Sequence, residues 1–143
     1  MSTSGGSSGG GQLSYVQAYL AADVALTSAA NAELVSVDLA AGTWLVNAYV
    51  LVVGPNGTTV SADAWIGPTS ASVTGAYASA SAVLNDTGST LFWAEMSFSS
   101  VLVLTATTTV YLNAFAAGTA EVYALSKQLS IPNSTGITAV KIA

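Results

Sequence analysis

The sequence predicts an all-β domain, built as a sandwich or barrel, and two observations support this fold class. Val, Ile, Thr, Tyr, Phe and Trp cluster in short runs from Gln12 onward, and these residue types suit half-buried, pleated strands. Gly, Asn, Asp, Pro and Ser separate the runs. Turn signals therefore recur roughly every 8–12 residues, which is typical of sandwiches and barrels.

Each expected strand is an apolar or β-branched run between two such breaks. In chain order the expected strands cover residues 14–20, 24–27, 33–39, 43–53, 58–66, 73–84, 91–98, 101–105, 108–115, 121–129 and 138–142. The segment 54–57, Gly-Pro-Asn-Gly, is expected to form the tight turn that joins strands 43–53 and 58–66.

Strand 43–53 is apolar on both faces, whereas a strand that covers a single core alternates apolar with polar residues. Its even-numbered residues from Trp44 to Val52 are all apolar. Its odd-numbered residues from Leu45 to Val53 are apolar as well, with Asn47 as the exception. Something must therefore cover the second face, and the pattern alone leaves open which face looks inward.

Three further strands show a period of two. In strand 108–115, Val110, Leu112 and Ala114 alternate with Tyr111, Asn113 and Phe115; in strand 91–98, Phe92, Ala94, Met96 and Phe98 alternate with Leu91, Trp93, Glu95 and Ser97. The first set of each has the composition of a core, and the second set has that of an interface. Within strand 73–84, residues 76–82 place four alanines on one face, which allows a second surface to approach closely.

The composition excludes several kinds of chemistry. The chain has no Cys and no His, so it holds no Ser-His-Asp or Cys-His nucleophile, no disulfide and no ordinary zinc site. Its only basic side chains are Lys127 and Lys141, which argues against a phosphoryl-transfer enzyme and against a protein that contacts nucleic-acid phosphates. We therefore expect no enzyme, no cofactor and no nucleic-acid partner.

The surface is expected to carry few charges. Charged residues make up 6% of the 143 residues and the net charge is −5, whereas ordinary soluble domains contain roughly a quarter charged residues. Such a surface suits a protein held at fixed sites in an assembly better than a free enzyme. The N-terminus lacks the features of a secretory signal, and the charge-free runs 39–62 and 96–120 are too often interrupted for transmembrane helices. We therefore expect no membrane partner and synthesis in the cytoplasm.

Candidate binding sites are sparse. The carboxylates are scattered, and no two have a spacing that demands an acid–base pair. The segment 85–88, Asn-Asp-Thr-Gly, lacks the acidic residues of a calcium loop, so a turn is favoured. The Trp and Tyr residues allow a sugar-binding platform, although packing is favoured for them. Asp63 and Glu95 lie mid-strand and are expected to face solvent.

Three stretches carry a resemblance to a known family. Residues 35–50, VSVDLAAGTWLVNAYV, resemble the core of small trimeric jelly rolls, the tumour-necrosis-factor-like and complement-globular-head-like modules. Residues 109–114, TVYLNA, resemble a late strand of these modules, and residues 136–142, GITAVKI, resemble the closing strand of their phage and bacterial versions. The metal and charge positions of the complement-like modules are not recognisable, which argues against charge-based receptor binding.

The resemblance implies a jelly-roll β-sandwich of about 8–10 antiparallel strands over residues 12–143. Residues 1–11 form a Gly/Ser-rich arm before it, with the composition of a flexible tether or of an added linker. The resemblance also implies a homotrimer in which the second face of strand 43–53 contacts a neighbouring subunit. The residues expected at the trimer interface are Trp44, Tyr49, Leu51, Val53, Trp93, Tyr111 and Phe115.

The function expected from this resemblance is structural, in the virion of a tailed phage. The first interpretation is a capsid decoration protein, a trimer that docks on the outside of the head lattice and stabilises it by adhesive contacts after assembly in the host cytoplasm. The arm would contact the major capsid protein through Ser2, Thr3, Ser4, Ser7, Ser8, Gln12 and Leu13. The alternative is the head or tip domain of a tail fibre or spike that binds a host receptor or glycan, and an enzyme such as a depolymerase is the least favoured.

Overall fold

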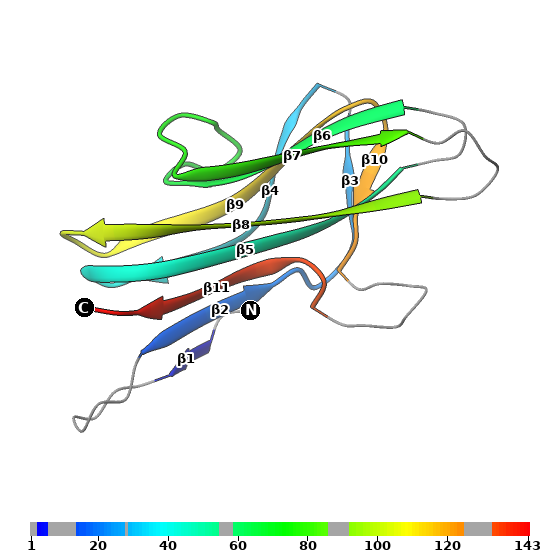
Figure 1. Cartoon of the computed structure of the whole chain (residues 1–143). Helices are drawn as coiled ribbons and strands as arrows, with labels where there is room; N and C mark the ends of the chain where they lie inside the picture. Colours follow the sequence, from blue (N-terminus) through cyan, green and yellow to red (C-terminus); the bar gives the residue numbers. More distant parts are fainter. Residues whose placement is uncertain (1–2, 6–13, 28, 55–58, 86–91, 125–132) are drawn as a thin grey trace.

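The protein is an all-β sandwich of two antiparallel sheets, as seen in a computed structural model (Figure 1). The structure describes residues 3–5, 14–27, 29–54, 59–85, 92–124 and 133–143. These residues include no helix, and therefore none that is long and apolar enough to cross a membrane. The fold class predicted from the sequence is confirmed.

The larger sheet has seven strands and is centred on the long strand β5 (Gly42–Gly54). On one side of β5 lies β8 (Phe92–Leu104), paired along its whole length. On the other side, β11 (Gly136–Lys141) pairs with the first half of β5, followed outward by β2 (Tyr15–Tyr19) and the short β1 (Thr3–Gly5). On the same side of β5, beyond the end of β11, the short strand β10 (Ala120–Val122) pairs with β5. The short strand β3 (Val24–Leu26) pairs with β10.

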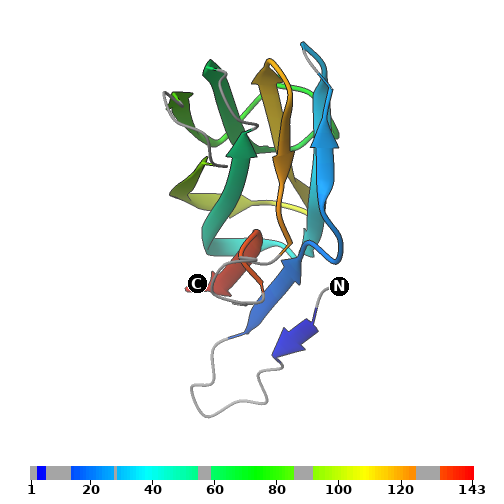
Figure 2. The ribbon, with the colours of Figure 1, turned by 90° about the vertical axis from the view of Figure 1, so that its right-hand side faces the viewer.

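The smaller sheet has four strands in the order β4-β9-β6-β7. They are β4 (Asn31–Leu39), β9 (Thr108–Ala117), β6 (Thr59–Gly67) and β7 (Ala78–Asn85). Figure 2, turned by 90°, shows β1 and β2 at the far end of the larger sheet, away from β6 and β7.

The strand order is that of a jelly roll. The main strands run 2-11-5-8 in one sheet and 4-9-6-7 in the other. The chain crosses between the sheets at each step from β3 to β6 and again at each step from β7 to β10. Eight strands arranged as two four-stranded sheets define this architecture. The short strands β1, β3 and β10 are additions to it.

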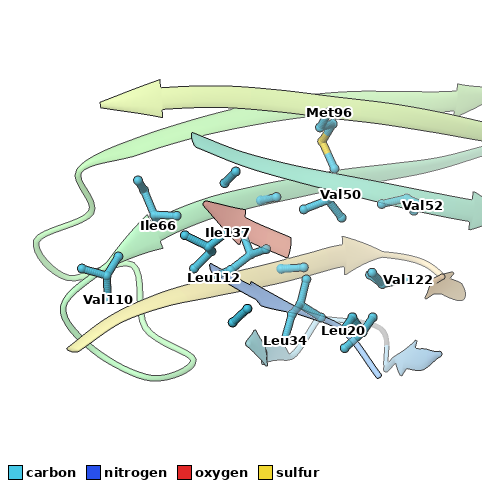
Figure 3. Packing of buried hydrophobic residues seen from close by; sticks show 14 of the residues in the cluster. Leu20, Leu34, Val50, Val52, Ile66, Met96, Val110, Leu112, Val122 and Ile137 are labelled. Atoms are coloured by element: carbon cyan, nitrogen blue, oxygen red, sulfur yellow. The ribbon is translucent and has the colours of Figure 1, made fainter. Parts of the chain in front are cut away.

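The core lies between the two sheets and resolves which face of β5 looks inward. The even-numbered residues from Trp44 to Val52 are all buried in the core cluster. Figure 3 shows Val50 and Ile137 from the larger sheet with Ile66 and Leu112 from the smaller sheet in the space between the ribbons. The inward sets of strands 91–98 and 108–115 also belong to this core, as their alternation predicted, apart from Phe92, whose side chain is not described.

The smaller sheet contributes many small residues to the core. Ala80, Ala64, Ala114 and Ala32 form one inward row across all four strands. The larger residues in the same cluster come from both sheets, among them Val50 and Ile137 of the larger sheet and Ile66 and Leu112 of the smaller one. Small and large side chains therefore complement each other between the sheets. The alanines of residues 76–82 were predicted to let a second surface approach closely. That surface is the larger sheet of the same chain.

Some predicted strand boundaries were wrong. Residues 91–98 and 101–105 were expected as two strands, but Phe92–Leu104 is continuous because Ser99 and Ser100 keep their pairing with β5. The strand expected at 73 begins at Ala78, because residues 68–77 form a loop. The strand expected over 121–129 ends at Val122, and its residues 125–129 lie outside the described residues. The turn residues 55–57 and 86–88 lie outside them as well.

Candidate interaction surfaces

The second half of the outer face of β5 is covered by the chain itself. Leu51, Val53 and Tyr123 form a small buried cluster on the side opposite the main core. Thr135 joins the strands beside this cluster, because its Oγ1 accepts a hydrogen bond from Leu51 N at 3.1 Å and donates one to Tyr123 O at 2.8 Å. The outward side chains of Leu51 and Val53 are thus covered within the subunit, without a neighbouring chain.

The first half of the outer face carries an exposed row of apolar side chains. Tyr15 pairs with Val140, Val140 with Leu45, and Leu45 with Val101, so the four lie side by side across β2, β11, β5 and β8. We call these four residues the apolar row. Tyr15 is 44%, Leu45 36% and Val101 56% exposed, so the row presents continuous apolar surface to solvent.

Two further outward rows follow along the same strands. Gln17, Thr138, Asn47 and Ser99 form a polar row, and beyond it Tyr19 and Tyr49 flank Gly136. A Cβ atom at Gly136 would lie 2.7 Å from Cδ1 of Tyr19, so glycine lets the Tyr19 ring lie across β11 toward Tyr49. The ring centroids are 6.3 Å apart. Burial, a hydrogen bond with Tyr19 and the charge of Tyr19 raise the pKa of Tyr49 above its usual range.

The apolar row reaches a free sheet edge. Among the described strands, β8 pairs only with β5, and its outward Val103, two residues beyond the row, is 75% exposed. Glu95 is the only charged residue in this strand of 13 residues. Long apolar edge strands with so little charge readily pair with another chain.

The outer face of the smaller sheet is partly covered by the loop 68–77. Asn113 of β9 is fully buried and holds this loop at two points: its Nδ2 donates to Thr69 O at 3.1 Å, and its Oδ1 accepts from Ala71 N at 2.9 Å. Trp65 Nε1 donates to Ser72 O at 2.7 Å, and Asn31 Nδ2 donates to Ala71 O at 3.1 Å. The loop is therefore fixed to the sheet.

A groove of about 390 Å³ lies beside this loop. Its floor is a cross-strand row, because Asn31 pairs with Phe115, Phe115 with Asp63, and Asp63 with Ser81. Ser81 Oγ donates a hydrogen bond to Asp63 Oδ1. The other residues that line the groove are Trp65 and Ser79 on the sheet and Val73 and Ala76 on the loop.

The structure divides the expected trimer-interface residues into three groups. Trp44 points into the core, where its Nε1 donates to Ala40 O at 2.8 Å, so its side chain leaves almost no surface for a neighbouring subunit. Leu51 and Val53 are covered by their own chain. These placements remove the three residues from the candidate interface, because a strand that is apolar on both faces can be covered within one subunit.

The remaining four candidates keep some accessible surface but do not lie together. Tyr49 is half-buried, and Trp93 on β8 is 51% exposed; both lie on the outer face of the larger sheet. Tyr111 and Phe115 are half-buried on the outer face of the smaller sheet, and Phe115 lines the groove. A contact made by one face of the subunit would therefore include only two of these four residues.

Most of the residues predicted to form the capsid contact of the arm lie outside the described residues. Of these candidates, the structure describes only Thr3 and Ser4. These two lie in β1 and pair with Gln17 and Val16 of β2, a strand that the sequence did not predict. Ser2, Ser7, Ser8, Gln12 and Leu13 lie outside the described residues.

Sequence reasoning missed the apolar row as a unit. Its members lie on strands that are far apart in sequence, and only the register of three strand pairs brings them together. Leu45 was the available signal, since it lies on the outward face of β5 beside the polar Asn47. Within the described part of the chain, no three His, Cys, Asp or Glu side chains gather to hold a metal ion. Asp63 is half-buried and Glu95 is exposed, in agreement with their expected solvent-facing positions.

Comparisons with known proteins show a likeness in fold alone. No protein-family model matches the sequence, and no curated protein matches it. A solved structure of infectious bursal disease virus, Gx strain, is similar with a TM-score of 0.51 and 15% identity, over 91% of this chain and 37% of that chain. A crystal structure of the infectious bursal disease virus VP2 subviral particle gives a TM-score of 0.44 and 13% identity, over 88% of this chain and 35% of that chain. The chain thus spans little more than a third of these viral chains.

Proposed function

We propose that the protein is a structural component of a virion, a capsid decoration protein that assembles as a homotrimer and binds the head lattice through adhesive contacts. The observation that carries this proposal is the apolar row, an exposed apolar surface that crosses four strands of a rigid sheet. Burial of such surface between subunits is the main favourable term in protein association. The function requires no catalytic chemistry.

Two further features support the proposal. Charged residues are only 6% of the chain, so contact with a neighbouring protein removes few charges from water. The jelly-roll fold, shared with a chain from a viral particle, is one that builds capsids. A fold hosts many functions, so this likeness is support by analogy.

In the proposed assembly, the apolar row lies between subunits and the N-terminal arm contacts the major capsid protein. The free edge of β8 borders the row, and the exposed Val103 on this strand extends the apolar surface. Trp93 lies four outward rows away on the same strand. Tyr49 lies two rows away on the same face. These residues replace Trp44, Leu51 and Val53 in the proposed interface.

The test is the copy number of the protein in purified virions, measured by quantitative mass spectrometry. The proposal predicts about one trimer for each local three-fold site of the capsid and loss of the protein from heads when residues 1–11 are deleted. A few copies per virion would instead indicate the tail fibre or spike tip, and absence from virions would refute both roles.

A further inference from the structure

We propose that the groove on the smaller sheet is a binding site for a neutral carbohydrate. It is formed by the row Asn31–Phe115–Asp63–Ser81 and by the loop 68–77. This site is separate from the apolar row, because the two lie on the outer faces of opposite sheets. A trimer that forms through the apolar row therefore leaves the groove free.

The groove is preformed. One wall is the loop segment that contains Val73 and Ala76, and the side chains of Asn113, Trp65 and Asn31 fix this loop to the sheet by hydrogen bonds to its backbone. Ser70 Oγ adds a fifth hydrogen bond, to Glu33 Oε1 at 2.5 Å. A wall held in this way loses little conformational entropy when a ligand binds.

The polar groups of the floor suit hydroxyl groups. Asp63 accepts a hydrogen bond from Ser81 through Oδ1, which leaves Oδ2 without a partner among the described residues. Asn31 and Ser79 add an amide and a hydroxyl that donate as well as accept, and Ser81 Oγ, whose proton is donated to Asp63, adds an acceptor. Neighbouring strands are about 4.8 Å apart, so Asp63 and Ser81 lie one strand spacing from each other, and Phe115 separates Asp63 from Asn31. A sugar presents a comparable series of hydroxyls that both donate and accept.

The aromatic part of the groove suits the other surface of a sugar ring. Phe115 is half-buried in the centre of the floor, next to Asp63, and the C–H face of a pyranose ring is apolar and packs on aromatic rings. Pockets with an apolar lining and a few polar groups are the usual ligand sites, with volumes of roughly 300–1,000 Å³. Val73, Ser79 and Ser81 are exposed, so the groove opens to solvent and accepts the end of a longer glycan.

Among the described residues, the charge of the lining argues against an anionic ligand. No Lys lines the groove among the described residues, and the carboxylate of Asp63 repels anions. Lys141 lies on β11 of the opposite sheet. Sialylated, sulfated and phosphorylated glycans would leave a charge unpaired beside a carboxylate. Neutral hexose or N-acetylhexosamine units match the groove better.

The experiment is saturation-transfer NMR, followed by calorimetric titration, on the full chain. The probes are neutral oligosaccharides of glucose, galactose, mannose and N-acetylglucosamine, with sialyllactose and a heparin fragment as anionic probes. We expect at least one neutral probe to bind. Asp63→Asn should weaken its binding about tenfold or more, the effect of losing a hydrogen bond to a charged group, and Ser79→Tyr should abolish it by filling the groove.

Matched controls lie on the same face of the same sheet. Asp38 accepts a hydrogen bond from Thr109 Oγ1 at 2.6 Å, so Asp38→Asn alters an equivalent cross-strand pair outside the groove, and Ser61→Tyr adds the same bulk on β6. Both controls should bind like the wild type. Thermal unfolding verifies that each variant folds. If Ser79→Tyr does not fold, the binding measurement on Asp63→Asn alone tests the site. Binding of no neutral probe, binding of anionic probes alone, or binding that Asp63→Asn leaves unchanged would refute the site.

Discussion

At the scale of single residues, Thr135 shows how one hydroxyl closes part of the outer face. It is fully buried and joins the backbones of Leu51 and Tyr123 through its Oγ1. Buried backbone groups require partners, because their loss of water is otherwise uncompensated. The cover of Leu51 and Val53 therefore depends on a polar residue as well as on apolar contact.

Thr135→Val tests this role, since valine has nearly the same shape but no hydroxyl. The variant leaves Leu51 N and Tyr123 O without this partner, and we expect the free energy of unfolding to fall by about 1–3 kcal/mol. Urea denaturation measures the change. Thr138→Val, on the polar row of the neighbouring strand β11, is the control and should have a smaller effect. Equal stability of Thr135→Val and the wild type would contradict the role.

Tyr49 predicts a pH dependence. Burial first, and then the hydrogen bond and charge interaction with Tyr19, raise the pKa of Tyr49 above its usual value of about 10. The folded state thus retains the phenolic proton more tightly than the unfolded chain does. Its contribution to stability is fully present below pH of about 10 and is lost as the pH rises above that value. Tyr49→Phe should therefore lose less stability than the wild type as the pH rises above about 10.

Chemical denaturation at several pH values measures this difference. Tyr15→Phe removes an exposed phenol from the same face of the sheet and controls for the loss of one ionisable group. If Tyr49→Phe and the wild type lose stability with the same slope, Tyr49 does not carry the pH dependence.

At the scale of elements, the fit between the sheets depends on small residues in β6, β7 and β9. Ala64 is fully buried in the centre of the inward alanine row. Ala64→Leu inserts extra methyl and methylene groups into a close-packed interior, and we expect a loss of about 1–3 kcal/mol in the free energy of unfolding. Calorimetry measures it. Ser61→Leu, at an outward position of the same strand, should change stability by less than about 0.5 kcal/mol. A variant Ala64→Leu as stable as the wild type would show that space remains between the sheets.

The elements also show how far the sequence predicts the structure. The alternation in β8 and β9 predicted their inward residues, because burial imposes a period of two on a strand. In β5 both faces are apolar, so the alternation left its inward face open. Part of the loop 68–77 was predicted as a strand. The hydrogen bonds that fix this loop come from the side chains of Asn113 and Trp65, and the alternation of residues within the loop does not reveal them. The apolar row and the groove floor were not predicted, because each depends on the register of several strand pairs.

At the scale of the whole molecule, the two sheets present different outer surfaces. The larger sheet presents the apolar row and a free edge at β8, and the smaller sheet presents a polar and aromatic groove beside a fixed loop. The two faces point in opposite directions. In the proposed decoration trimer, the first face associates with other subunits while the second remains available for a ligand.

The central claim is that the apolar row holds subunits together, and sedimentation equilibrium of the purified chain tests it most directly. We expect three times the mass of one chain for the wild type and the mass of one folded chain for Val101→Asp, because the aspartate places a charge in the subunit contact. The matched control is Val83→Asp, at a site on β7 that is 69% exposed on the opposite face; this variant should remain trimeric. A monomeric wild type, or a trimer that Val101→Asp leaves intact, would contradict the claim.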